Sequence, residues 1–510
     1  MRSIGSHWRA GISLLAALAA LGAPLEAAKS PRGGGTLRVE LRAATVSLDP
    51  REWRAGSEEA ASGAKLAALV FDRLVVLDNY GHFLPQLAAE WSHDSAFRRW
   101  QFTLRPGVKF SDGAPLTAAD VVAALQPLLP ASRQVSAAGS SVVFESAAPI
   151  PDLLEELTSG RYFIYRAPSA GALLGSGPFV LAAAPAVGTA GPAAARNEAR
   201  LFFRANLEGW SGRPFVDAVE VTLGVPPLRQ LHDLQLGRAD LVELFPDQVR
   251  RAAQAGLRTW ASAPLTLYAL RFDEAQPAVQ DPRLREAISL ALDRGTMAGV
   301  LLQKQAEPAT ALLPQWLSGY AFLFTVETNA ERAKELRATL PGNVASVAEP
   351  LRLRVDAPGD LAKLLGDRVA VNARQAQLLV QVVNRATPHT ATPAAQGPAP
   401  GLRLISWRLA SLSPRAELEA LAAALGLAEA AAGAAPAGVS AAGPEQLYAS
   451  EQRILGERRV LPLVVLPEFA GIGANVRNWT PARWGEWHLA DVWLDGPESP
   501  APSKSSGEKP

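Results

Sequence analysis

Residues 99–104 form the strand signal that most constrains the fold of this chain. In the segment RWQFTL, the large apolar residues Trp100, Phe102 and Leu104 alternate with polar residues. This alternation is typical of a strand with one face in a core and the other in solvent. The segment therefore predicts a half-buried strand.

Two turns and a helix start follow this strand immediately. Pro106-Gly107 predicts a hairpin turn into a second short strand at 108–110, and Asp112-Gly113 predicts another turn. Thr117 is a good N-cap, and Asp120 stands three residues later, near the positive end of the helix that follows. The stretch therefore predicts a hairpin, a turn and a capped helix.

Further helices and strands alternate loosely along the rest of the chain. Residues 281–302 have apolar positions at helical spacing and Pro282 in the first turn, which predicts one long helix. Residues 329–340 predict a helix capped by Asn329, and VLPLVVLPEF at 460–469 predicts a buried strand. This order favours an α/β or α+β fold.

Length and charge limit the possible functions. At 510 residues, two or three domains are expected. The 50 Lys and Arg residues balance 49 Asp and Glu residues, so the net charge is +1. The basic residues are scattered and are not interleaved with aromatic residues, so a nucleic-acid partner is not expected.

The first 28 residues have the pattern of an export signal. Arg2 and Arg9 precede the apolar run AGISLLAALAALGA, which is too short to span a membrane easily. Ala27 and Ala28 offer a cleavage point, and the alternative is a retained membrane anchor. The chain has no cysteine, which excludes disulfides and a lipid anchor on an N-terminal cysteine. We therefore expect a soluble mature protein in the periplasm.

Four stretches have biased composition. Residues 182–195, 386–401 and 426–443 are rich in Ala, Pro and Gly, which is typical of surface loops or flexible connections. The tail after residue 495 is predicted to be disordered.

Motifs for catalysis or metal binding are missing. The six histidines never stand three or four residues apart, so a metal site built from neighbouring histidines is not expected, although isolated ligands could still converge in space. No nucleophile elbow, phosphate-binding loop or dinucleotide fingerprint occurs. Ser62 and Lys65 fit S-x-x-K, but the companion motifs of that chemistry are absent, so a surface position on a helix is expected. The sequence predicts no enzyme, no cofactor and no metal.

The region after Phe71 resembles a known family over a long motif. It reads LAAEW, then FTLRPGVKFSDGAPLTAADVV, and it is similar to the corresponding segment of bacterial extracellular solute-binding proteins of the peptide/nickel class, family 5. These proteins are components of ABC importers. The matching positions are Leu87, Ala88, Glu90, Trp91, Phe102, Leu104, Arg105, Gly107, Val108, Phe110, Asp112, Gly113, Pro115, Thr117, Ala118, Asp120 and Val121.

The resemblance continues in order over nearly the whole mature chain. GSGPFVL, RANLEGWSGRPFVDAVEV, LQLGRADL and YALRFDEAQPAVQDPRLREAISLALDR each resemble a family block, as does the C-terminal segment YASEQRILGERRVLPLVVLPEF. In the second of these, the matching positions are Asn206, Trp210, Gly212, Pro214 and Asp217.

The resemblance implies an α/β fold with two lobes joined by hinge strands, and a ligand trapped in the cleft between them. The implied partners are a peptide-like or other small solute and an ABC permease in the inner membrane, and a monomer is expected. The expected organisation is a signal peptide at 1–28, a first lobe at 29–265 with a subdomain inserted at about 60–175, a second lobe at 266–470, a return to the first lobe at 471–495 and a disordered tail at 496–510.

The resemblance also implies where the ligand lies. In peptide binders of this family, a W-x-x-D-Y-x-D-P segment carries an aspartate that pairs with the ligand's ammonium group. Here the segment reads WRLASLSP, so Ala410 and Ser413 stand at the two aspartate positions. Asp273 replaces the family's asparagine after Phe272. The candidate ligand-binding residues are Trp407, Arg408, Ala410, Ser411, Tyr268, Arg271 and Asp273.

Two hypotheses follow for the ligand. Without the aspartate, the ligand has a blocked or absent ammonium group or is anionic, and Arg408 contacts it. Alternatively, Arg408 points to solvent and another carboxylate, such as Asp273, takes over the missing role. For the function as a whole, the alternative to import is a transport-inactive cleft protein that acts as a sensory or scaffolding partner.

Overall fold

The computed structural model describes residues 30–168, 173–183, 199–346, 349–384, 400–431 and 443–496. The predicted signal peptide lies outside the described residues, as do the tail beyond residue 496 and most of the Ala/Pro-rich stretches at 182–195, 386–401 and 426–443.

One large sheet runs through the molecule. Among the described residues, eleven strands form it, and its main path has the order β15-β14-β16-β12-β17-β11-β1-β10-β9-β8, with β13 paired to β17. The strands are β1 (Thr36–Glu40), β8 (Phe179–Ala182), β9 (Arg200–Ala205), β10 (Ala218–Thr222), β11 (Leu241–Leu244), β12 (Arg258–Phe272), β13 (Glu307–Pro308), β14 (Leu351–Val355), β15 (Val380–Asn384), β16 (Leu402–Arg408) and β17 (Val460–Ile472).

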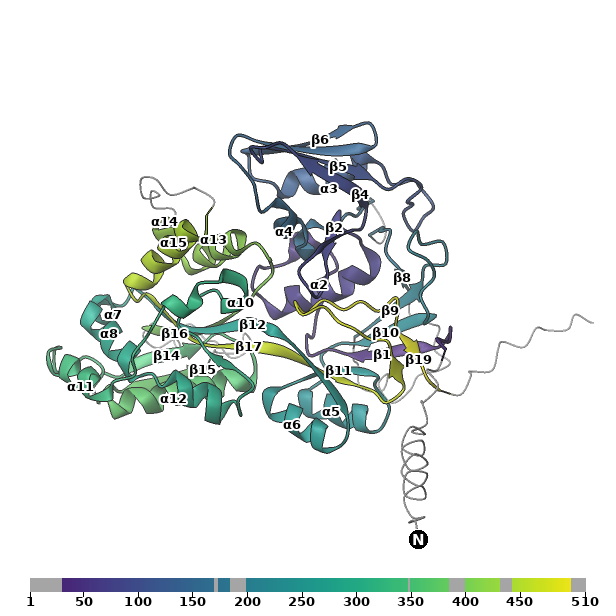
Figure 1. The fold of residues 1–510 in the computed structure, drawn as a ribbon. Coiled ribbons are helices and arrows are strands. Elements are labelled where there is room, and N and C mark those ends of the chain that lie inside the picture. Colours follow the sequence, from purple (N-terminus) through teal and green to yellow (C-terminus); the bar gives the residue numbers. More distant parts are fainter. Residues whose placement is uncertain are drawn as a thin grey trace, which may run out of the picture.

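The two longest strands join two lobes. Strands β12 and β17 run antiparallel from one half of the molecule into the other (Figure 1). Their register shifts around Pro264 and Pro467, near the middle of the pair. Proline removes a ladder hydrogen bond, so this is where the paired strands bend most easily. We call the half that carries β1 and β8–β11 the first lobe and the half that carries β14–β16 the second lobe.

The first lobe packs helices on its part of the large sheet. These helices are α2 (Glu58–Val70), α5 (Pro227–Gln235) and α6 (Pro246–Gln254). Leu37 and Val39 on β1 lie in one core with Leu66 and Val70 on α2. The short strands β18 (Val476–Arg477) and β19 (Trp493–Leu494) return to this lobe from the C-terminal side, and Trp487 and Val492 belong to the same core.

A smaller sheet with its own core lies above the first lobe (Figure 1). It has the order β4-β5-β7-β6, formed by β4 (Ala88–His93), β5 (Arg99–Leu104), β6 (Arg133–Ala138) and β7 (Ser141–Ser146). The helices α3 (Ala118–Leu125) and α4 (Leu153–Leu157) and the hairpin of β2 (Val75–Leu77) and β3 (Phe83–Pro85) accompany it.

The local signals at 99–125 are confirmed with one correction. Trp100, Phe102 and Leu104 are buried on β5, and Thr117 and Asp120 form a reciprocal capping box at the start of α3. The predicted hairpin into 108–110 is wrong, because β4 and β7 already occupy both edges of β5. Residues 108–110 bury Val108 and Phe110 without joining the sheet.

The second lobe surrounds the other end of the large sheet with helices. They are α7 (Pro277–Gln280), α8 (Pro282–Ala291), α9 (Arg294–Thr296), α10 (Gln315–Ser318), α11 (Ala330–Ala338), α12 (Gly359–Gln375), α13 (Pro414–Leu425), α14 (Ala428–Ala431) and α15 (Pro444–Gly456). The predicted helix at 281–302 is interrupted at Leu292, because the Asp293 side chain accepts from the Thr296 N–H and starts a new turn. The cap at Asn329 is confirmed. The domain boundaries given above remain a proposal.

Candidate functional site

Two adjoining cavities lie between the lobes. The larger has a volume of about 910 Å³ and the smaller about 360 Å³. Gly56, Ala61, Lys65 and Arg408 line both, so the two cavities are compartments of one cleft. A volume of several hundred cubic ångströms is the usual size of a small-molecule site.

The larger cavity is rich in aromatic rings. Its walls come from the first lobe, from the segment after α4, from the end of β16 and the start of α13, and from residues 484–486. The aromatic rings that line it are Trp53, Tyr162, Trp316, Trp407 and Trp484. Rings of this kind give a ligand large apolar contact area with few rotatable bonds to fix.

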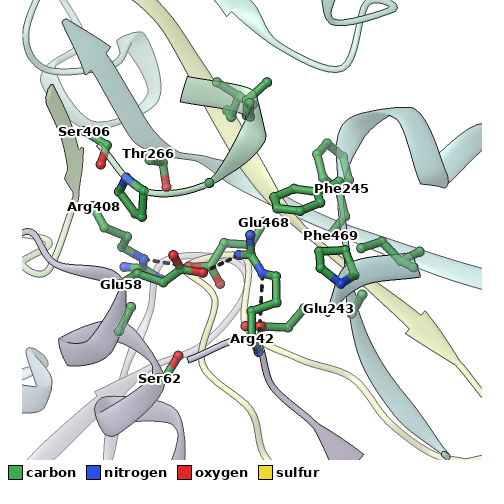
Figure 2. Close-up of a pocket in the computed structure, with 18 of the residues that line it drawn as sticks. Arg42, Glu58, Ser62, Glu243, Phe245, Thr266, Ser406, Arg408, Glu468 and Phe469 are labelled. Atoms are coloured by element: carbon green, nitrogen blue, oxygen red, sulfur yellow. Dashed lines mark hydrogen bonds and ion pairs between the residues drawn. The ribbon is translucent and has the colours of Figure 1, made fainter. Parts of the chain in front are cut away.

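The smaller cavity is lined by a chain of alternating charges (Figure 2). Arg42 lies between Glu58, at 2.8 Å, and Glu243, at 3.2 Å. Lys65 then bridges Glu243, at 3.3 Å, and Glu468, at 3.0 Å. Glu468 in turn accepts a 2.7 Å bond from Arg408. The three cations and three carboxylates neutralise one another, so this wall carries no formal net charge.

Mutual pairing controls the pKa values in this chain. Burial alone would raise the pKa of Glu468, but Arg408 and Lys65 lower it to about 2. Burial would likewise raise the pKa of Glu243, and Lys65 and Arg42 hold it below its ordinary value. Glu58 is the last carboxylate in this row of alternating charges and has only Arg42 beside it in the row, so burial outweighs Arg42 and raises the pKa of Glu58. Glu243 and Glu468, in the middle of this row of charges, are therefore firmly ionised.

The two lobes touch directly across the cleft. The Arg408 N–H on β16 donates to the Gly56 carbonyl of the first lobe at 2.9 Å. Gly56 has a φ of +75° and stands so close to the Trp407 ring that an added Cβ would lie 2.2 Å from it. Between the small-sheet region and α13, Asp152 accepts from the Ser413 hydroxyl at 2.6 Å. These contacts describe a closed cleft.

Comparison with known proteins identifies the family. A model of the bacterial extracellular solute-binding proteins, family 5 Middle, matches residues 82–339, about half of the chain. The chain belongs to this family. Its relatives include the Probable di/tripeptide-binding protein 5 of Pseudomonas aeruginosa, 27% identical over 60% of this chain and 64% of the relative. The Nickel-binding periplasmic protein of Escherichia coli is 24% identical over the same shares.

Solved structures of similar proteins confirm the predicted fold class. The murein tripeptide binding protein MppA of Escherichia coli superposes with a TM-score of 0.73 at 18% identity, over 91% of this chain and 99% of that one. The dipeptide binding protein of Pseudoalteromonas sp. SM9913, in complex with Met-Leu, gives 0.73 at 15% identity, over 90% and 100%. This family 5 chain thus has the two-lobed fold of periplasmic binding proteins. It matches less than two thirds of the length of its first curated relatives.

The structure brings together five of the seven predicted ligand-binding residues. Trp407, Arg408, Ala410 and Ser411 line the larger cavity, and Arg408 also lines the smaller one with Tyr268.

The other two, Arg271 and Asp273, line neither cavity. Asp273 accepts a 2.9 Å bond from Arg403 instead. The roles of all seven in ligand binding remain predictions.

A carboxylate that the sequence did not single out stands behind the WRLASLSP segment. Glu417 on α13 is buried and lines the larger cavity. It accepts bonds from the Trp407 indole at 2.6 Å and from the N–H groups of Ala410 at 3.0 Å and Ser411 at 2.7 Å. Burial raises its pKa despite these donors. Ser413 is the N-cap of α13, so the signal that could have located Glu417 was this helix start.

The expected surface position of the S-x-x-K residues is wrong. Ser62 and Lys65 are both buried on α2, and Lys65 belongs to the charge chain. Burial alone would lower the pKa of Lys65, but Glu468 and Glu243 hold it above its ordinary value, so it is a structural cation.

Two general features of the described residues bear on the site. None of the described helices is both long and apolar enough to cross a membrane. Within the same ranges, no group of three or more His, Cys, Asp or Glu side chains is arranged to hold a metal ion.

Proposed function

We propose that this protein captures a peptide-like solute in the cleft between its lobes and delivers it to the permease of an ABC importer. The observation that carries the proposal is an unpaired strand edge in the cleft wall. Strand β16 pairs with β14 only at residues 402–404, whereas it pairs with β12 as far as Arg408. Beyond Leu404 its other edge faces the first lobe.

The backbone of Ser406 is directed to this open edge. The Leu404 carbonyl accepts from the N–H groups of Asp356 and Ala357, and the Arg408 N–H donates to Gly56, both on the side away from β12. Backbone groups alternate along a strand, so those of Ser406 point the same way. Ser406 lines the smaller cavity. An extended peptide can add to such an edge through main-chain hydrogen bonds, while neighbouring pockets take its side chains.

Similar proteins support a peptide-like ligand. The relatives and structures named above include binders of dipeptides and tripeptides. Placement in the periplasm, partnership with an inner-membrane permease, a monomeric state and the absence of enzymatic activity belong to the same proposal. The periplasmic location rests on relatives described as periplasmic binding proteins.

The charges in the cleft favour the hypothesis that another carboxylate takes over the role of the missing aspartate, but with a carboxylate other than Asp273. The Arg408 guanidinium already donates to Glu468, to the Leu409 carbonyl and to the Trp484 carbonyl, which speaks against an anionic ligand at this residue. Glu417 and the exposed Glu419 line the larger cavity, and neither forms an ion pair with a described cation. We therefore place a ligand ammonium near these two carboxylates rather than near Asp273.

Calorimetry with short peptides tests this proposal. Mass spectrometry of the solute that co-purifies with the protein supplies the sequence to synthesise. The free-amine peptide is expected to bind at least tenfold more tightly than its N-acetylated form, because a charge pair of this kind contributes at least about 1.4 kcal/mol. Glu419→Gln should reduce this preference, and Glu335→Gln on the surface of α11 is the control.

The outcomes separate the function from the ammonium site. If both peptide forms bind equally well, the ammonium site is wrong and peptide capture stands. Recovery of a solute without peptide bonds, with no binding of peptides, would overturn the proposed function itself.

A further inference from the structure

Trp316 lies in the wall of the larger cavity on a short segment with little regular secondary structure. It belongs to α10, which has only four residues. Its indole N–H donates to the Pro264 carbonyl on β12 at 2.8 Å, and its ring lies 5.5 Å from that of Trp484. Trp316 thus connects the second lobe, the bend of the long strands and the returning C-terminal segment. A helix of one turn does not hold such a position by itself.

The groups that fix this segment converge on Glu451. Glu451 lies on α15 and is fully buried. One carboxylate oxygen accepts from the backbone N–H groups of Leu312 and, at 3.1 Å, Leu313. The other accepts from the Tyr320 hydroxyl at 2.8 Å. These contacts lie just before and just after Trp316 in the chain, so one side chain fastens both ends of the segment.

We propose that Glu451 is a positioning residue that sets the place of Trp316 in the cavity wall. The inference rests on the proposed function, because it assumes that this cavity receives the solute. Glu451 itself lines neither cavity, so it acts on the solute only through the segment it fastens.

The surroundings of Glu451 make this attachment sensitive to pH. Its titratable neighbours are Tyr320, which bonds to it, and Tyr448 on the same helix, whose ring lies 5.6 Å from that of Tyr320. No described cation forms an ion pair with it. Burial raises the pKa of Glu451 to about 7, against an ordinary value of 4.5.

The sign of the effect follows from linkage. An acid whose pKa is raised when the segment is docked stabilises docking fully below pH 4.5, and this contribution is lost as the pH rises through 7. Over the whole titration, the difference of pKa corresponds to a change of about three-hundredfold in the docking equilibrium, and about a hundredfold of it falls between pH 5 and pH 8. The segment should therefore open more often at pH 8 than at pH 5.

Hydrogen exchange of residues 309–324 tests the inference without any solute. After correction for intrinsic exchange rates, protection in the wild-type protein should fall by about a hundredfold between pH 5 and pH 8. Glu451→Gln keeps the acceptor and the shape but does not titrate, so its protection should be high and independent of pH. Glu451→Ala should lose protection at both pH values.

Two further variants complete the test. Glu156→Gln is a control in the other lobe: Glu156 is also buried and accepts from a tyrosine hydroxyl, that of Tyr162, but it pairs with Arg133 at 2.6 Å, and its pH profile for 309–324 should equal the wild type. The difference in fluorescence between the wild type and Trp316→Phe gives the emission of Trp316 itself. Acrylamide should quench this emission more strongly at pH 8 than at pH 5, and only in protein that keeps Glu451. The same pH slope in Glu451→Gln as in the wild type would overturn the inference. Because no solute is used, that result leaves the proposed function untouched.

Discussion

Replacing Glu468 with glutamine is expected to lower the free energy of unfolding by about 3–5 kcal/mol at pH 7. Glu468 is the carboxylate between Lys65, at 3.0 Å, and Arg408, at 2.7 Å. Lys65 is buried and Arg408 nearly so, and removal of the charge leaves two like charges close together with only Glu243 to compensate Lys65. Breaking one partner of a buried pair costs far more than the pair contributes over an apolar replacement.

Denaturant unfolding measures this loss, as a lower midpoint with an unchanged slope. The control is Glu335→Gln, which removes a pair with Arg332 of similar length, 2.7 Å, between largely exposed side chains. Exposed pairs contribute about 0–1 kcal/mol, so this variant should be nearly neutral. A loss below about 1 kcal/mol for Glu468→Gln would show that Glu468 does not stabilise the folded protein through Lys65 and Arg408.

The pH dependence separates Glu468 from Glu451. The pKa of Glu468 is lowered to about 2 in the folded protein, so its stabilisation is present above its ordinary pKa of 4.5 and is lost as the pH falls through 2. Glu451 acts in the opposite direction between pH 4.5 and 7. We expect Glu468→Gln to flatten the acid side of the stability profile and Glu451→Gln the neutral side.

How much of this could be predicted from the sequence depends on the distance over which each interaction acts. The N-cap at Thr117 and the buried face of β5 each depend on residues a few positions apart, and both were predicted correctly; the reciprocal bond that makes Thr117 and Asp120 a capping box was not. The predicted hairpin into 108–110 does not form, because β4 and β7 occupy both edges of β5 in the sheet. Local turn residues carry no information about which edges other strands occupy.

The site shows the same limit more strongly. The charge chain joins Arg42 and Lys65 to Glu468, which lies more than four hundred positions later in the sequence. The spacing of these residues does not predict that they meet. The WRLASLSP segment was singled out because it resembles a family motif; the structure places it in the wall of the larger cavity, and its role in ligand binding remains a prediction. The carboxylate behind it, Glu417, comes from the next helix and faces inward only because Ser413 starts that helix where it does.

Gly56→Ala is expected to prevent closure of the cleft and to weaken solute binding at least a hundredfold. A Cβ at this position would lie 2.2 Å from the Trp407 ring, and atoms below 3.0 Å must move. The ring cannot move easily, because its indole N–H is bonded to the buried Glu417 at 2.6 Å. The Gly56 carbonyl also accepts from the Arg408 N–H, so a displaced loop loses the bond that joins the lobes.

Small-angle scattering and calorimetry with the co-purified solute check this expectation. The wild-type radius of gyration should decrease on saturation, as expected for hinge closure, whereas that of Gly56→Ala should stay at the larger value. Gly81→Ala is the matched control, because Gly81 has a similar φ of +89° but open space around it, so it carries the backbone strain of about 1–2 kcal/mol without the clash. Trp407→Leu combined with Gly56→Ala should restore closure by removing the ring. If the radius of gyration of Gly56→Ala decreases on saturation as much as that of Gly81→Ala, closure of the cleft does not depend on the close approach of Gly56 and Trp407.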